Sequence, residues 1–137
     1  MPQARNANEQ LVIDFFATLS TGDLARVRTF FDDDTTWAPM VKDVPGAGEH
    51  KGAAIVDEFL GPVRGLFKAG DPKVHVDNLV SSDNFVMCET RGIGTLADGR
   101  PYENLYAWAI QIEGGRIKRI REYFDSHYVM QLFGAGQ

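Results

Sequence analysis

The sequence predicts an α+β fold, in which helices from the first half of the chain pack on a sheet formed by the second half. Apolar residues recur at helical spacing in the first 67 residues. From residue 73 onward, long segments with strand-like alternation are separated by tight turns. Helices followed by an antiparallel meander are typical of this class. The length of 137 residues favours a single domain spanning residues 1–137.

Three helices are expected before the strands begin. The first covers "NEQLVIDFFATLS" (8–20), and the second covers "DLARVRTFF" (23–31). Residues 41–52 hold three glycines and a proline, which favours a loop. The third helix covers residues 53–67, and Pro62 should kink it or shift its register because proline has no N–H.

Four long strands are expected in the second half, followed by a tail without regular structure from residue 127. They cover residues 73–80, 84–96, 101–113 and 116–126. The turns "ADGR" and "EGGR" join the last three strands as hairpins. Antiparallel strands of this length, covered by helices on one face, curl strongly.

The composition argues against several classes of binding partner and cofactor. The net charge of −5 argues against nucleic acid and anionic membranes, which bind basic surfaces. Cys88 is the only cysteine, so a disulfide within the chain and a multi-cysteine zinc site are excluded. The sequence shows no signal region, no apolar run long enough to span a bilayer and no phosphate-binding glycine loop. We therefore expect a cytoplasmic protein without a nucleotide, metal or other cofactor.

One face of the strand at residues 101–113 is unusually aromatic. It carries Tyr102, Asn104, Tyr106, Trp108 and Ile110. The opposite face carries the small side chains of Ala107 and Ala109. The aromatic face either fills a core or lines a cavity, and an amide among aromatic rings is costly unless it is hydrogen-bonded.

Three segments give the chain a family resemblance: "FFDDDTTW", "GEHKG" and "DGRPYENLYAWAIQIEGGRIKRIREYFD". With them, it resembles the cone-shaped fold shared by nuclear transport factor 2 (NTF2), ketosteroid isomerases and SnoaL-like polyketide cyclases. The resemblance implies three N-terminal helices on a strongly curved antiparallel sheet that encloses an apolar pocket. It also implies a homodimer through the outer sheet face, where Ala107 and Ala109 would lie flat against a partner.

The resemblance to limonene-epoxide hydrolases within this fold points to three charged pocket positions. They are Glu89, Arg91 and Glu122 in this chain. Their residue types differ from those enzymes, and the water-holding positions carry Trp37 and Pro39, so epoxide hydrolysis is not expected. Nor are the tyrosine and aspartate of the steroid isomerases evident.

Glu89, Arg91 and Glu122 still form a candidate catalytic cluster on physical grounds. A carboxylate in an apolar pocket has a raised pKa and suits acid–base catalysis, while Arg91 could hold a substrate oxygen. Two alternatives stay open. The cluster could be a structural salt bridge, or a bulge near Gly92 or Gly94 could reverse the faces of the strand.

Other aromatic and soft side chains are expected to bind the substrate. They are Tyr106, Asn104, Trp108, Trp37, Phe16 and Met40, the last at the rim. His50 should lie near the pocket mouth, and His127 beside Asp125 is a weaker acid–base candidate. Cys88 is expected as a small buried residue at the dimer face.

Two functions from different classes follow from these residues. The first is a cofactor-free isomerase, hydratase, dehydratase or cyclase that acts on a small hydrophobic molecule. The second is a non-catalytic module for ligand binding or dimerisation.

Overall fold

A computed structural model describes residues 2–134 and confirms the α+β class. The helices are α1 (Ala7–Thr21), α2 (Leu24–Arg28), the π-helical segment η1 (Ile55–Leu60), α3 (Gly61–Arg64) and α4 (Ser126–Phe133). The strands are β1 (Thr36–Pro39), β2 (His50–Lys51), β3 (Lys73–Ser82), β4 (Phe85–Thr95), β5 (Pro101–Glu113) and β6 (Arg116–Phe124). Within residues 2–134, no helix is long and apolar enough to cross a membrane.

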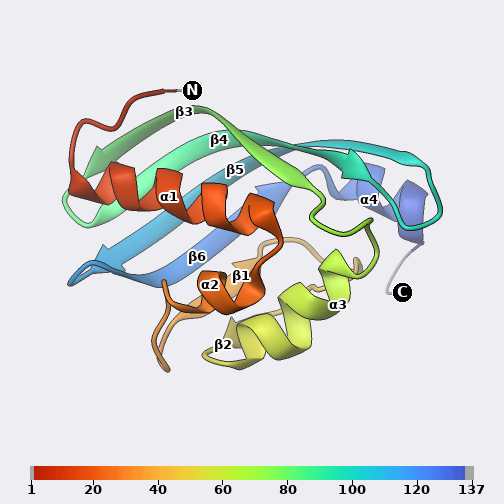
Figure 1. Cartoon of the computed structure of the whole chain (residues 1–137), viewed down its shortest axis with the longest axis horizontal. Coiled ribbons are helices and arrows are strands. Elements are labelled where there is room, and N and C mark those ends of the chain that lie inside the picture. Colours follow the sequence, from red (N-terminus) through yellow and green to blue (C-terminus); the bar gives the residue numbers. More distant parts are fainter. Residues whose placement is uncertain (1, 135–137) are drawn as a thin grey trace.

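The strands form one six-stranded curved sheet in the order β2-β1-β6-β5-β4-β3 (Figure 1). The pairs β3–β4, β4–β5 and β5–β6 are antiparallel, as expected from the hairpin turns. The short strand β1 departs from the expected pattern because it runs parallel to β6. This pairing places Trp37 beside the last long strand, directly opposite Ile120.

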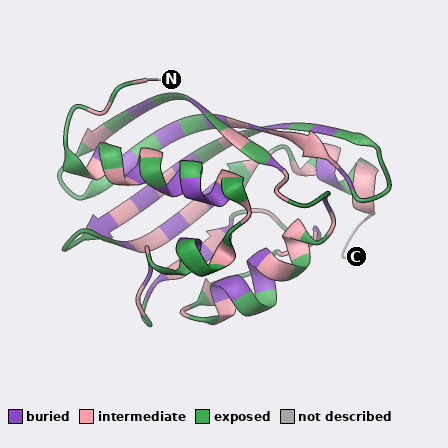
Figure 2. Cartoon of the chain, in the orientation of Figure 1, coloured by how far each residue is buried: buried purple, intermediate pink, exposed green. Residues whose placement is uncertain are grey.

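Helix α1 lies across the concave side of the sheet and turns its apolar stripe toward it (Figures 1 and 2). The buried apolar residues of the helix are Val12, Phe15, Phe16 and Leu19. Gly22 ends the helix at a φ of 79°, a left-handed conformation that glycine adopts without steric cost. The predicted first helix and its inward face are therefore confirmed.

The third predicted helix is disturbed at Pro62, as expected. The segment η1 before it is wound as a wide π-helical turn, and the Gly61 N–H donates to the Val56 carbonyl oxygen. Helix α3 then continues for one turn to Arg64. The register shift places Phe59 and Val63 against the cavity described below.

Two short elements differ from the sequence predictions. The expected loop at residues 41–52 contains β2, which pairs with β1. The tail forms α4 instead of irregular structure, because Asp125 caps it by accepting the Tyr128 N–H at 3.1 Å. Phe133 on this helix packs on Phe67, so α4 closes one end of the molecule (Figure 1).

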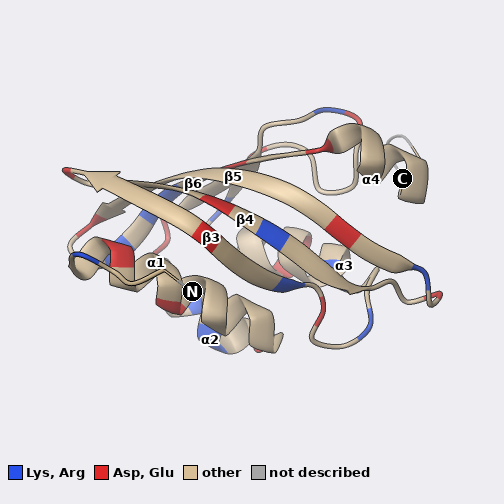
Figure 3. Cartoon of the chain, turned by 90° about the horizontal axis from the view of Figure 1, so that it is seen from above, with Lys and Arg blue, Asp and Glu red and all other residues tan. Residues whose placement is uncertain are grey.

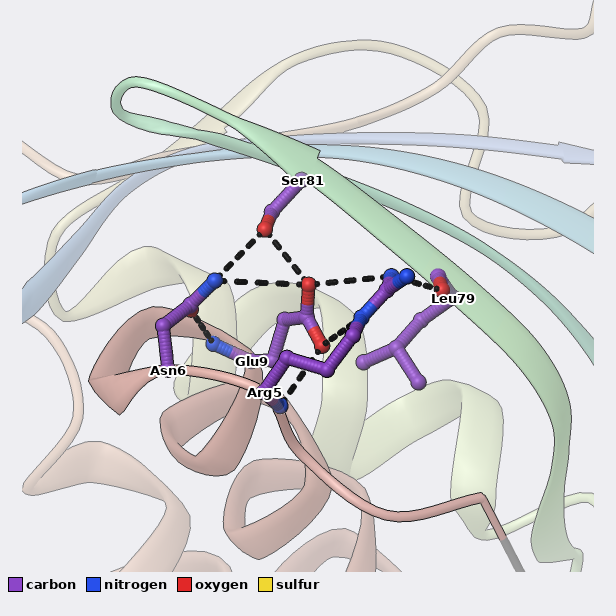
Figure 4. A network of polar contacts seen from close by, with 5 residues as sticks. All are labelled: Arg5, Asn6, Glu9, Leu79 and Ser81. Carbon is purple, nitrogen blue, oxygen red and sulfur yellow. Dashed lines mark hydrogen bonds and ion pairs between the residues drawn. The ribbon is translucent and has the colours of Figure 1, made fainter.

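A polar network around Glu9 ties the start of α1 to β3 (Figure 4). Its side chain is 1% exposed and accepts hydrogen bonds from Arg5 Nε at 3.2 Å and Ser81 Oγ at 2.5 Å. Arg5 also donates to the Leu79 carbonyl oxygen at 2.9 Å, and Asn6 Oδ1 accepts the Glu9 N–H. The Ser81 and Arg5 hydrogen bonds lower the pKa of Glu9 to about 2.

Candidate functional site

A cavity of about 90 Å³ lies between the inner face of the sheet, the η1–α3 segment and α4. Its walls are mostly apolar. The polar side chains among its lining residues are Trp37, Arg64, Tyr102, Tyr106, Trp108 and Glu122. Small concave apolar sites with a few convergent polar groups are typical of ligand-binding sites.

The aromatic face of β5 contributes one wall of this cavity. Tyr102, Tyr106 and Trp108 all line it, and the rings of Tyr106 and Trp108 are stacked with their centroids 5.7 Å apart. The Trp108 Nε1–H donates to Thr90 Oγ1 at 2.9 Å, which fixes the indole. The alternation on β5 therefore predicted the inward face of this strand correctly.

Three other predicted binding residues do not line the cavity. Phe16 lies behind the wall, its ring 4.9 Å from that of Trp108. Asn104 is buried behind Tyr102. Met40 is 45% exposed. The lining of the cavity thus includes Trp37 but neither Met40 nor Phe16.

Glu122, on β6, is the one acidic residue among those that line the cavity. Trp37 Nε1 donates to its Oε1 at 2.9 Å. Burial raises the pKa of Glu122 to about 7, and the Trp37 hydrogen bond opposes the rise only in part. This carboxyl therefore keeps its proton to a higher pH than an ordinary glutamate does.

The second oxygen of Glu122 is available to a ligand. No side chain among residues 2–134 donates to Oε2. Within the same residues, Arg119 Nε is the only fully buried side-chain polar atom without a partner. Oε2 has no partner and is not fully buried, and Glu122 lines the cavity.

The expected cluster of Glu89, Arg91 and Glu122 is wrong, because only Glu122 lies on the inner face of the sheet. Glu89 is exposed and accepts a hydrogen bond from Asn78 at 2.9 Å. Arg91 is paired with Asp77 at 3.0 Å. Figure 3 shows acidic and basic segments along β3 and β4.

The pairing of β4 with β5 explains why this prediction failed. Cys88 lies opposite Trp108, and Thr90 lies opposite Tyr106. Directly opposed residues of an antiparallel pair share a face, so the even-numbered residues of β4 point inward. Cys88 is accordingly buried in the core and not at the outer face, and burial raises its pKa to about 12. The irregularity in register falls in β3, between Val76 and Asn78, and not at the glycines of β4.

A chain of hydrogen bonds leads from Asn104 to Tyr106. Backbone partners fix the amide, because Asn104 Oδ1 accepts the Leu105 N–H and Nδ2 donates to the Asp125 carbonyl oxygen. Nδ2 also donates to the Tyr102 hydroxyl oxygen at 3.2 Å. The hydroxyls of Tyr102 and Tyr106 are 2.5 Å apart.

The two hydroxyls share one of their protons. Tyr102 accepts from Asn104, and either hydroxyl can be the donor in the contact between Tyr102 and Tyr106. When Tyr102 donates in this contact, the proton of Tyr106 is free to donate to a ligand oxygen. Burial raises the pKa of both phenols, that of Tyr102 to about 12, so both remain protonated donors at neutral pH.

Sequence reasoning missed two residues that shape the cavity. Arg64 ends α3 and lines the cavity, but an arginine near a helix end gave no signal that distinguished it from a surface residue. Gly92 faces Tyr106, and a Cβ there would lie 2.8 Å from Tyr106 Cε1. The glycine therefore makes room for the phenol ring. Glycines within strands often occur where another group approaches the backbone closely.

His50 and His127, the two histidines considered as site candidates, do not line the cavity. The His50 ring stacks on Phe59 at 4.4 Å, and its Nε2 lies 2.8 Å from the Gly46 carbonyl oxygen. His127 is exposed on α4. In the described part of the chain, no three His, Cys, Asp or Glu residues are grouped as possible metal ligands.

The comparison with protein families supports the fold. The model of the SnoaL-like domain matches residues 12–120. The chain belongs to the SnoaL-like family. A search of curated proteins finds no match for this SnoaL-like chain.

Solved structures confirm the NTF2-like fold of this SnoaL-like chain. An NTF2-like protein of unknown function from Burkholderia pseudomallei has a TM-score of 0.81 at 19% identity, covering 93% of this chain and 97% of that chain. TerC co-crystallized with polyporic acid has a TM-score of 0.78 at 16% identity, covering 92% and 99%.

A third structure has a bound small molecule. A protein with a ketosteroid isomerase-like fold from Catenulispora acidiphila, in complex with trimethylamine, has a TM-score of 0.75 at 14% identity. The alignment covers 88% of this chain and 89% of that chain. At these identities the likeness of all three structures shows the fold alone.

Proposed function

We propose that this SnoaL-like protein binds a small, largely apolar molecule and catalyses a proton transfer on it without a cofactor. The observation that carries the proposal is Glu122, a buried carboxyl with a pKa of about 7 and one oxygen open to the cavity. A group whose pKa lies near neutral pH serves both as a general base and as a general acid. The reaction classes are isomerisation, hydration or dehydration, and cyclisation.

The polar groups of the cavity have complementary roles in such a step. The Trp37 N–H holds one oxygen of Glu122, so the other oxygen abstracts a proton next to a substrate carbonyl group. The Tyr106 hydroxyl donates to the carbonyl oxygen, where negative charge develops. Return of the proton from Glu122 to another atom of the substrate completes an isomerisation and regenerates the carboxylate.

Ligands of structural neighbours are consistent with a small-molecule site. TerC was co-crystallized with polyporic acid, and the Catenulispora acidiphila protein with this fold is in complex with trimethylamine. These molecules differ from each other, so we take from them only that proteins with this fold hold small molecules.

Hydrogen–deuterium exchange tests the proposal without knowledge of the natural substrate. The wild-type chain should accelerate exchange of the α-protons of small cyclic ketones in D₂O, as followed by ¹H NMR. The rate should rise with pH around the pKa of about 7 of Glu122. Glu122→Gln should reduce the catalysed rate by about 10²–10⁴-fold, the usual contribution of a general base.

Glu89→Gln is the matched control, because Glu89 is a glutamate on the outer face of the sheet. It should exchange ketone protons at the wild-type rate. Equal rates for wild type and Glu122→Gln would refute catalysis by this carboxyl.

A non-catalytic role in dimerisation is the alternative, and the outer face of the sheet favours it. Val80, Met87 and Leu105 are each more than half exposed on β3, β4 and β5, and Ala107 adds no bulk between them. Exposed apolar patches of this kind mark association sites. We propose a homodimer through this face, which Leu105→Glu should convert to a monomer in light scattering. An unchanged mass would contradict it.

A further inference from the structure

Arg64 places a positive charge in the wall of the cavity. Its Nη2 donates to the Pro72 carbonyl oxygen at 2.9 Å and to the Gly70 carbonyl oxygen at 3.4 Å. These two backbone contacts orient the guanidinium from one side. A guanidinium has five N–H donors, and within residues 2–134 these two contacts involve Nη2 alone.

No carboxylate in the described part of the chain forms an ion pair with Arg64. Asp71 attracts the guanidinium from a distance, but its Oδ2 accepts the Thr95 N–H at 2.9 Å. Glu122 lines the same cavity and is likewise not paired with it. A half-buried cation held only by carbonyl groups carries an unused attraction for an anion.

The Tyr106 hydroxyl lies within electrostatic reach of Arg64, and both side chains line the cavity. The Tyr106 hydroxyl is free to donate to a ligand when Tyr102 donates to it. The guanidinium suits an anionic oxygen group, whereas the surrounding walls suit an apolar body.

We propose that Arg64 binds an anionic oxygen group, such as a carboxylate, on an otherwise apolar ligand. The ligand class is therefore a small organic acid, and Arg64 is the residue that selects it. This inference deepens the proposed function and rests on it for the claim that the ligand is a substrate. The binding preference itself does not depend on catalysis by Glu122.

Benzoate and benzamide test the preference, because the two probes have nearly the same shape and differ in charge. Binding is measured by calorimetry or ligand-observed NMR at pH 6, where Glu122 is mostly protonated and does not repel the anion. Wild type should bind benzoate at least about tenfold more tightly than benzamide, the ratio expected from a charge-assisted hydrogen bond. Arg64→Met should lose this preference and keep its affinity for benzamide.

Two further variants keep the test sharp. Arg64→Lys retains the charge without the planar fork and should keep part of the preference. Arg91→Met is the matched control, because Arg91 lies on the outer face and is paired with Asp77. It should bind both probes as wild type does.

The inference is overturned if wild type binds no benzoate, if it binds the two probes equally, or if Arg64→Met keeps the preference. If Arg64→Met fails to fold, the wild-type preference and Arg64→Lys still give an answer. Failure of the proposed function is distinguishable, because wild type and Glu122→Gln would then show equal rates of ketone exchange, whatever the preference for benzoate.

Discussion

Glu9 and Glu122 are both buried glutamates, but the surroundings of Glu9 stabilise its charged form and those of Glu122 destabilise it. Glu9 lies where α1 meets β3 and accepts hydrogen bonds from Arg5 and Ser81. Glu122 lies in the cavity and accepts one hydrogen bond, from Trp37. The pKa is about 2 for Glu9 and about 7 for Glu122.

The difference shows that burial alone does not determine the ionisation of a carboxyl group. Donors at Glu9 replace the water that the folded chain removes, so its charged form is favoured. At Glu122 desolvation is only partly compensated, so its neutral form is favoured up to neutral pH. The first arrangement stabilises the fold, and the second retains a reactive group at a cost in stability.

Glu122→Gln should produce the largest change in stability. A carboxyl with a folded-state pKa of about 7 and an ordinary value of 4.5 destabilises the folded state by about 3 kcal/mol when it is ionised above pH 7. The penalty is absent below pH 4.5 and grows as the pH rises to 7. The amide oxygen of the substituted side chain can still accept the Trp37 N–H, so the variant should be more stable than wild type above pH 7. Urea denaturation at several pH values measures this difference.

Glu89→Gln serves as the control for this series, because Glu89 is exposed. Its stability should follow that of wild type at every pH. A Glu122→Gln variant that gains no stability between pH 4.5 and 7 would show that the cavity solvates the charge, and the contrast with Glu9 would disappear.

Glu9→Gln should change stability in the opposite direction and by a smaller amount, since its partner Arg5 is largely exposed to solvent. The amide brings N–H donors against Arg5 and Ser81 and removes the negative charge. The stabilisation by Glu9 is fully present above pH 4.5 and is lost as the pH falls toward 2. The variant should therefore be less stable at pH 7, and the two proteins should converge in acid, as thermal unfolding followed by circular dichroism would show.

Glu58→Gln provides a matched control, because Glu58 is an exposed glutamate on η1. If Glu9→Gln is as stable as wild type at pH 7, the network in Figure 4 does not favour the charged carboxylate.

Removing the single donor to Glu122 tests how far one hydrogen bond lowers the pKa of this carboxyl. Trp37→Phe eliminates the hydrogen bond that partly opposes desolvation, so the pKa of Glu122 should rise above 7. The titration can be followed by NMR of chain labelled with ¹³C in the glutamate carboxyl groups. An unchanged or lower pKa would mean that water entering from the cavity replaces the indole.

Much of the fold was predictable because local patterns determine it. Alternation on β5 placed Tyr106 and Trp108 inward, and the absent N–H of Pro62 predicted the irregular turn before α3. The end helix α4 was missed because its cap at Asp125 lay within the predicted last strand, residues 116–126.

The site was predictable only in part, because it depends on the pairing of strands. Apolar residues occur on both faces of β4, with Val86 and Cys88 on one and Phe85 and Met87 on the other, so the sequence did not determine which face was buried. Glu122 was identified through the family resemblance. Arg64 was missed because tertiary packing alone brings the end of α3 to the cavity.

The smallest expected effect comes from removing one donor of several at Glu9. Ser81→Ala should raise the pKa of Glu9 above about 2, because the Ser81 hydrogen bond is the largest cause of its depression. Arg5 still donates to the carboxylate, so the pKa should stay below the ordinary value of 4.5. The same ¹³C titration measures it, with Ser82→Ala as the control on the exposed neighbour. A pKa that reaches the ordinary value would show that Arg5 holds the charge only when Ser81 is present. In that case the stability of the charged Glu9 is a property of the whole network, whereas the reactivity proposed for Glu122 depends on having so few partners.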